Sequence, residues 1–351
     1  MHMADALISP LVGGAMWAAA ACVTLYSTRK MQRSVDERRV PLMGVLGAFV
    51  FAAQMINFTI PGTGSSGHLG GGLLLTILLG PPAAFITIAS ILTVQALFFA
   101  DGGLLALGCN IINMGLFPCF VVYPLLYRPL AGKKPTGGRR MLAAIVGAVV
   151  GLQLGALGVV TEAMMSGASD LPFSKFLMLM QPIHLAIGLV EGLVTASVVG
   201  FLARVRPEVL DQIPSAAEGR RGIQPVVVGM LVAAVVTAGL VSWFASTHPD
   251  GLEWAIARST GHVSLPPPID PVHNAAKHVQ EKTAILPAYD LPMQERPTAT
   301  ELDDKSARNA WGIPSVGTSV AGLAGGAASL VLAMGVAWVF RPRRATDSAS
   351  Q

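Results

Sequence analysis

Long apolar segments alternate with short polar ones along nearly the whole chain. A helix needs about 20 apolar residues to cross the hydrocarbon part of a membrane. Segments at or near this length occur at 9–28, 40–57, 69–80, 82–100, 103–127, 141–166, 175–203, 222–245 and 315–340. The pattern therefore predicts an all-α fold, a polytopic membrane helical bundle of about nine spans.

The segment at 69–80 differs from the others because it is short, begins with glycines and is followed by Gly80-Pro81-Pro82. Short apolar segments interrupted by glycine or proline often border a cavity instead of facing lipid. We therefore expect this segment to lie beside a functional site.

Composition supports a membrane protein. Hydrophobic residues make up 52% of the chain and charged residues 13%, whereas a soluble domain carries about 25% charged residues. The net charge of +4 comes from short basic runs between apolar segments. Membrane topology explains these runs, so we expect membrane lipid and no nucleic acid as a partner.

Basic residues also predict the orientation. They concentrate at 29–39, 128–140 and 204–221 and in the tail at 341–344. Cytoplasmic loops are the ones enriched in Lys and Arg. If these four regions are cytoplasmic, nine spans alternate consistently and the N-terminus is outside. No Lys or Arg precedes the first apolar segment, which favours a retained span over a signal peptide.

A polar stretch divides the chain into two predicted units. We expect a seven-span domain over 1–205, a cytoplasmic linker over 206–221 and a two-span domain over 222–345. The second domain contains a long outer loop at 246–313. Its proline and polar content predicts partial disorder, and its histidines (His248, His262, His273 and His278) are expected to be solvated, as is Glu162 near an outer span end.

The start of the chain offers a compact set of metal donors. Met1 carries a free amine, and His2 adds a backbone amide and an imidazole. These three nitrogens can close fused chelate rings around one ion, and a second imidazole would complete a plane of four. Such a plane suits Ni(II) or Cu(II) better than Zn(II), which prefers a tetrahedron. The alternative is that His2 is a frayed terminal residue.

The second imidazole is expected from His68. It lies in a run with Gly62, Gly64, Gly67 and Gly70–Gly72, on the same side of the predicted bundle as His2. Glycines allow close backbone approach and unusual dihedral angles. The alternative is a surface turn with a bystander histidine.

Further polar residues accompany this pair. Asp5 is expected either to orient a ligand or to cap the first helix, and Asn57 either to brace the His68 loop or to end a helix. His184 and Glu191 are seven residues apart and share one face of a span. Buried ionisable groups usually face the bundle interior. We expect a structural polar contact for both, with contact to a coupling protein or a role in moving the His68 loop as alternatives.

Four motifs together resemble one family. They are Met1-His2-x-x-Asp5-x-x-x-Ser9-Pro10, Asn57-Phe58-x-x-Pro61-Gly62 followed by Ser66-Gly67-His68-Leu69, His184-x-x-Ile187-Gly188-x-x-Glu191-Gly192, and Pro249-Asp250-Gly251-Leu252-Glu253. The chain is similar to the CbiM/NikM family, the substrate-capture components of cobalt and nickel energy-coupling-factor (ECF) transporters. The fourth motif resembles the NikN-type PDGLE partner, here fused to the first domain.

The resemblance implies metal ligation by the Met1 amine, the His2 amide and imidazole, and the His68 imidazole. Asp5, Asn57, Ser66, His184 and Glu191 become candidates for supporting or coupling roles. This sequence departs from the family pattern at Ala6 and in a longer spacer at 63–65, which affects loop shape and no donor atom.

The resemblance also implies a transported substrate, Ni(II) or Co(II), with no organic cofactor, in a bacterial or archaeal cell (inner) membrane. An ECF coupling membrane protein and ABC-type ATPase subunits would be the partners. The chain has no GxxxxGK[ST] phosphate loop and no HExxH motif, which fits a transporter component that is not an enzyme. The alternatives are a membrane enzyme or assembly factor linked to cobalamin biosynthesis, and a stand-alone secondary transporter. The choice between nickel and cobalt stays open, with four planar nitrogens favouring nickel.

Overall fold

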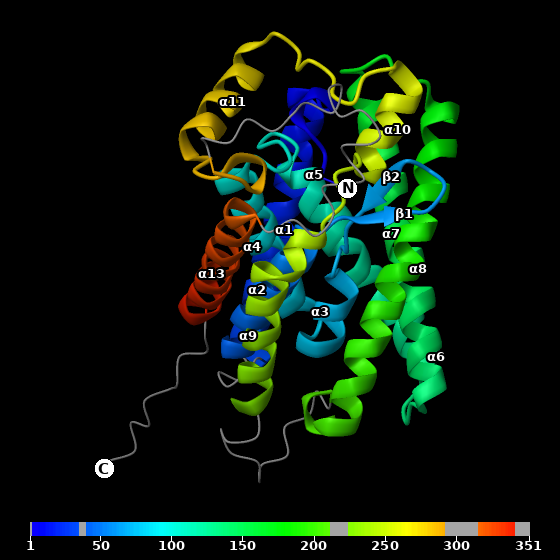
Figure 1. Ribbon diagram of the computed structural model, residues 1–351, viewed down its shortest axis with the longest axis vertical. Coiled ribbons are helices and arrows are strands. Elements are labelled where there is room, and N and C mark those ends of the chain that lie inside the picture. The colour runs from blue at the N-terminus through cyan, green and yellow to red at the C-terminus, as the bar shows by residue number, and fades with distance from the viewer. Residues whose placement is uncertain (1, 35–39, 211–223, 292–314, 341–351) are drawn as a thin grey trace.

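The computed structural model describes residues 2–34, 40–210, 224–291 and 315–340 and consists largely of helices (Figure 1). The helices of the first unit are α1 (Pro10–Ser34), α2 (Val40–Gln54), α3 (Gly72–Leu79), α4 (Pro81–Phe99), α5 (Leu107–Ile111), η3 (Ile112–Tyr127), α6 (Arg128–Ala131), α7 (Gly137–Ser166) and α8 (Phe173–Val205). The second unit contributes α9 (Gln224–Gly239), α10 (Gly251–Thr260), α11 (Pro271–Thr283) and α13 (Val316–Val339). Short helical turns are η1 (Asp5–Leu7), η4 (Pro207–Val209), η5 (Val241–Phe244) and η6 (Pro287–Tyr289).

Six helical segments in the described ranges are long and apolar enough to cross a membrane. They are α1, α4, the continuous run from α5 to α6, α7, α8 and α13. The predicted all-α, multi-pass membrane bundle is therefore confirmed, with one small hairpin added. The count of nine spans is not, because α2 and α9 have only 15 and 16 residues and α3 has eight.

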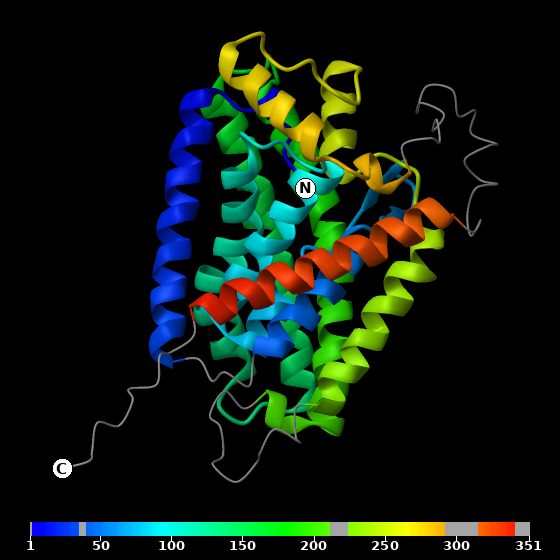
Figure 2. The ribbon, with the colours of Figure 1, turned by 90° about the vertical axis from the view of Figure 1, so that its left-hand side faces the viewer.

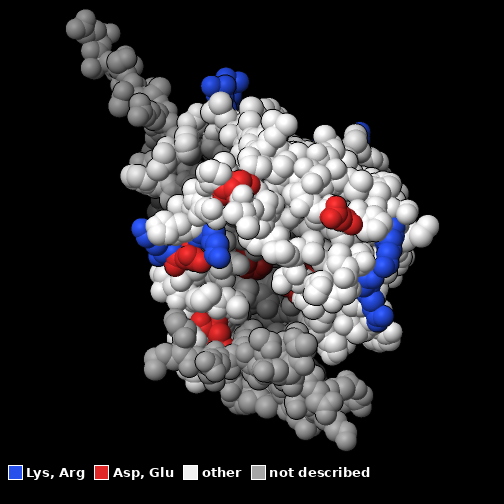
Figure 3. Space-filling model, turned by 90° about the horizontal axis from the view of Figure 1, so that it is seen from above, with Lys and Arg blue, Asp and Glu red and all other residues white. Residues whose placement is uncertain are grey.

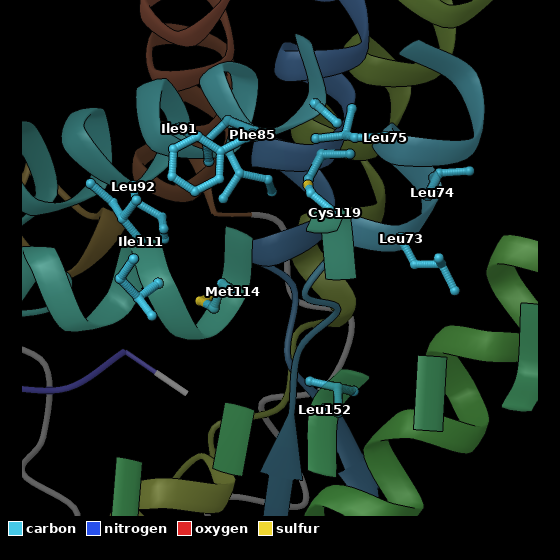
Figure 4. Close-up of a cluster of buried hydrophobic side chains, with 14 of the residues drawn as sticks. Leu73, Leu74, Leu75, Phe85, Ile91, Leu92, Ile111, Met114, Cys119 and Leu152 are labelled. Carbon is cyan, nitrogen blue, oxygen red and sulfur yellow. The ribbon is translucent and has the colours of Figure 1, made fainter. Parts of the chain in front are cut away.

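The shortness of α3 follows from the glycines that bound it. Gly71 and Gly80 adopt φ angles of +73° and +83°, a region in which a side chain is disfavoured. Every residue of α3 is buried, and its leucines join Phe85 of α4 and Cys119 of η3 in the core (Figure 4). The short, glycine-fronted segment is thus enclosed by protein, as predicted.

Helices α7 and α8 pack closely because glycines lie at their contact. A Cβ atom on Gly188 would come within 2.8 Å of Val149 Cα, and one on Gly192 within 2.6 Å of Ile145 Cα. Small residues at four-residue spacing allow such close helix approach in membranes. The pairing leaves His184 and Glu191 of α8 buried, on the side that meets the loop before α3.

The two predicted units share an interface. Helix α13 crosses α2 and α4, and α9 also packs on α2 (Figure 2). The crossing is close at Gly325, where a Cβ atom would lie 2.0 Å from Phe51 Cζ. The linker expected over 206–221 begins with η4, and its residues from 211 onward lie outside the described ranges.

The outer loop is more ordered than its composition predicts. Residues 246–291 include α10, α11 and η6, which cover one end of the bundle (Figure 1). Asp250 and Glu253 form a reciprocal capping box on α10, and Asp270 caps α11 ahead of Pro271. These caps satisfy N–H groups that would otherwise lack partners. The expectation of disorder is wrong for these residues, whereas 292–313 lie outside the described ranges.

Few charged side chains are visible from the end that carries α10 and α11 (Figure 3). The basic loops at 128–140 and 204–206 lie at the opposite end (Figure 1). This separation agrees with the charge asymmetry on which the predicted orientation rests.

A valine in place of Gly325 should force α13 away from α2, because its Cβ would overlap the ring of Phe51. Overpacking of this kind costs about 1–3 kcal/mol, so the midpoint of thermal unfolding in detergent should fall by several degrees. The matched control is Gly335→Val in the same helix, where no atom lies within 4 Å of the added Cβ. Equal midpoints for the two variants would contradict this interface.

Candidate metal centre

The segment that follows the chain start is firmly held. The Met3 N–H donates to Asn110 Oδ1 at 2.8 Å, and Asn110 Nδ2 donates back to Met3 O at 3.2 Å. The Gly103 N–H also donates to Met3 O, at 2.9 Å. The His2 side chain is only 5% exposed, so the frayed-end alternative is wrong for His2. Met1 lies outside the described residues.

His2 and His68 lie against each other, as predicted. Their ring centroids are 4.8 Å apart and their planes differ by 11°. His68 is 7% exposed, so the bystander alternative is also wrong. The structure thus buries two imidazoles from residues 66 positions apart in one small space.

A hairpin delivers His68 to this position. Strand β1 (Phe58–Ile60) pairs antiparallel with β2 (Ser65–Gly67), with Phe58 opposite Gly67. Gly62 and Gly64 in the turn both have positive φ angles, which explains why the sequence needs glycine there. The residues after β2 then pass inward toward α3.

Glu191 of α8 fixes the stretch just after His68. Its carboxylate accepts from the N–H groups of Gly70 at 2.7 Å and Gly71 at 3.1 Å. On the other side, Gln54 donates to Gly70 O at 2.7 Å and accepts from Gln95 Nε2 at 3.0 Å. Hydrogen bonds to a charged acceptor are the stronger kind, so Glu191 is a main anchor of the loop.

Two carboxylates that the sequence analysis did not single out as site residues border the imidazoles. Asp101 Oδ1 lies 3.3 Å from His2 Nδ1, and Asp250 Oδ2 lies 3.9 Å from His68 Nε2. Asp101 also accepts from the Tyr289 hydroxyl, and burial raises the pKa of Asp101. Asp101 directly follows an apolar segment, and Asp250 belongs to the PDGLE motif. These positions are the features of the sequence that could have marked the two carboxylates as candidate site residues.

The imidazoles are held in their neutral form. Burial lowers the pKa of His2 to about 3 and that of His68 to about 3. His68 Nδ1 donates to Leu69 O at 3.1 Å, which leaves the Nε2 lone pair facing Asp250. His2 Nε2 is buried beside the side chain of Gln95, whose Oε1 is also buried. Lone pairs and carboxylates gathered here favour a cation.

Side chains alone do not complete a metal site. Within the described ranges, no three His, Cys, Asp or Glu side chains are arranged to hold an ion. The predicted amine donor belongs to Met1, outside the described residues, so the donor set from the chain start stays a prediction.

The supporting candidates have varied roles. Asp5 does not cap α1, because its Oδ1 accepts from the Ala106 N–H at 2.9 Å and so braces the loop before α5. Asn57 lies beyond the end of α2, and its carbonyl accepts from the Ser246 N–H at 2.7 Å. Ser66 donates from its N–H to Pro249 O at 2.8 Å and from its hydroxyl to His248 O at 2.7 Å. The outer segment is thus joined to the His68 hairpin.

His273 and Glu162 are both buried. The sequence predicts solvated side chains at these positions, and this prediction is wrong. His273 is 3% exposed, its Nδ1 lies 2.5 Å from Asp270 Oδ2, and its Nε2 faces Asp5 O at 3.1 Å and Ile8 O at 2.9 Å. Both ring nitrogens therefore face oxygen atoms, and the ring joins α11 to the segment before α1. Glu162 is buried and accepts from Asn113 at 2.8 Å.

Two family models match this chain. The model described as the cobalt uptake substrate-specific transmembrane region, CbiM, matches residues 2–209, and the PDGLE domain model matches residues 224–342. A putative fused nickel transport protein NikMN of Archaeoglobus fulgidus is 36% identical over 63% of this chain and 70% of its own. A probable fused nickel transport protein LarMN of Lactiplantibacillus plantarum is 30% identical over 78% of this chain and 85% of its own.

A solved structure is also similar. The crystal structure of a truncated transition metal transporter superposes with a TM-score of 0.52 at 32% identity, over 58% of this chain and 99% of that one.

Replacing Glu191 by Gln should loosen the His68 loop. The amide keeps one acceptor but points an N–H donor at a backbone N–H, and leaving a buried group unsatisfied costs about 1–3 kcal/mol. Hydrogen exchange at the Gly70 and Gly71 amides should speed up by about tenfold or more. The control is Glu281→Gln on the exposed face of α11, where the carboxylate is 61% exposed. Unchanged exchange in Glu191→Gln would show that the loop is anchored by other contacts.

Proposed function

The chain belongs to the CbiM family of transition-metal transport proteins and carries a fused PDGLE domain, and from this premise we propose that it captures Ni(II) or Co(II) on the outer side of the membrane for import. The observation that carries the proposal is the buried, stacked pair of neutral imidazoles, His2 and His68. Of the two ring nitrogens of His2, only Nδ1 can close a chelate ring with the residue's own amide, and Nδ1 lies beside the Asp101 carboxylate at 3.3 Å.

The proposed ligands are nitrogens. Met1 supplies the terminal amine, His2 its deprotonated amide and its imidazole, and His68 a second imidazole. The low pKa values of both histidines, near 3, keep their lone pairs available to a metal at neutral pH. The hydrogen bonds of Met3 with Asn110 and Gly103 fix the backbone directly after His2, which reduces the entropy lost when a chelate closes.

This donor set explains selectivity. Mg(II) and Ca(II) prefer oxygen ligands, whereas imidazole and amide nitrogen suit Ni(II), Co(II) and Cu(II). Asp101 and Asp250 sit beside the imidazoles at 3.3 and 3.9 Å. They add negative charge next to the ion and orient the rings, as carboxylates around metal-bound histidines commonly do.

One residue added before Met1 should abolish high-affinity binding, because it moves the amine away from the chelate. His68→Ala should weaken binding by more than about 100-fold, since losing even a residue that only supports a ligand costs 10–100-fold. Both are measured by titration calorimetry of the purified chain with Ni(II) and with Co(II). The control is His262→Ala, an exposed histidine of the outer segment. Binding that is unchanged in the extended chain would remove the terminal amine from the site.

Energy for import comes from other subunits. The sequence lacks a P-loop, so ATP hydrolysis belongs to separate ABC-type ATPases that act through an ECF coupling membrane protein. The rivals are a stand-alone secondary transporter and a membrane enzyme or assembly factor linked to cobalamin biosynthesis. Neighbouring genes for a P-loop ATPase and a coupling protein would favour the ECF complex.

In cells that express the chain with those partners, replacing the P-loop lysine of the ATPase by alanine should stop Ni(II) accumulation. Binding of Ni(II) to the purified chain should not change, because capture needs no nucleotide. The measurement is uptake of radioactive nickel, with His68→Ala as the variant that fails at both steps. Uptake that continues without ATPase activity would favour the secondary transporter.

A further inference from the structure

His184 has a buried nitrogen that the proposed capture site does not use. It lies in α8 and is 1% exposed. Its Nδ1 donates to Met180 O at 2.8 Å, so in the neutral ring the lone pair is on Nε2. Nε2 is fully buried and makes no hydrogen bond with any described residue. A helix in a membrane protein keeps such a group only where something compensates for it.

The ring of His184 lines a small cavity that His68 also lines. Met114, Leu152 and Gly251 form further parts of the wall. The backbone of Gly251 forms one wall of the cavity. A Cβ atom at this position would lie 3.3 Å from His184 Cε1 and 3.2 Å from Ile187 Cδ1 and would narrow the cavity. Glycine at this position therefore leaves the cavity open beside the imidazole.

The chemistry of the wall favours a transition metal over a hard cation. Its lining residues include His184, with an imidazole nitrogen, and Met114, with a thioether, and both groups are ligands of borderline and soft metals. The nearby carboxylate of Glu191 is already engaged by the Gly70 and Gly71 N–H groups. A cavity with these donors and no carboxylate among its lining residues suits Ni(II), Co(II) or Cu(II) and not Mg(II) or Ca(II).

We propose that this cavity is a second, transient position for the transported ion, with His184 Nε2 as its principal ligand. The proposal rests on the proposed function and extends it to release. Four-coordinate planar complexes exchange their ligands through attack by a fifth donor, and His184 supplies that donor next to His68. The ion can then leave the fused chelate in steps, without passing through a bare, unligated state.

The test is titration calorimetry of the purified full chain with Ni(II), analysed for the number of ions bound. The wild-type chain should bind one ion tightly and a second one weakly. In His184→Leu the weak event should disappear while the tight one remains. The matched control is His278→Leu in α11, an exposed histidine, which should keep both events. His184→Gln, with an amide that binds metals poorly, should reproduce the loss without altering the packing volume as much.

The outcomes separate this inference from the proposed function. A tight event that survives an added residue before Met1 would contradict the capture site. A tight event that behaves as proposed, with a weak event that is absent from the wild-type chain or survives His184→Leu and His184→Gln, would overturn the second position. Loss of the tight event in both His184 variants, in protein that unfolds at the wild-type temperature, would also overturn it, because His184 would then belong to the capture site.

Discussion

The structure depends on satisfying irregular backbone inside an apolar bundle. Within a membrane, N–H and C=O groups outside helices must find partners in the protein. The stretch from Ser66 to Gly71 is such a case, and it carries His68. Glu191 accepts from two of its N–H groups, and Gln54 donates to Gly70 O. Without these partners from α8 and α2 the loop could not remain buried, and the two imidazoles could not meet.

The second domain completes this arrangement. The N–H and hydroxyl of Ser66 donate to carbonyls of the outer segment, and Trp254 Nε1 donates to Thr63 O at 3.0 Å. The same segment brings Asp250 to His68 and, through His273, holds the carbonyls of Asp5 and Ile8. The fused domain therefore encloses both halves of the site, which gives a physical reason for carrying it on the same chain.

Structural features that depend on a short stretch of sequence could be predicted correctly. Apolar length located the long helices α1, α4, α7, α8 and α13, and the glycines around His68 and at Gly80 predicted a short, enclosed segment. The span count failed because α2 and α9 are shorter than their apolar segments and α3 does not cross the bundle. The burial of His273 had no local signal, since it depends on contacts with residues 265 and 268 positions away. Asp101, after an apolar segment, and Asp250, in the PDGLE motif, occupy positions that draw attention in the sequence, but their proximity to the imidazoles is a product of the fold.

The proposed site, built from the chain start, differs from a site built from side chains alone. Side-chain motifs such as paired cysteines can be recognised anywhere in a sequence, but an amine and a backbone amide look the same in every protein. In this protein the amine and amide of the chain start are distinguished by the packing that surrounds His2. Asn110 and Gly103 hold Met3, and burial keeps His2 neutral. Each of these constraints lies outside the proposed donor set, so in the proposed site selectivity depends as much on the packing around His2 as on the ligands.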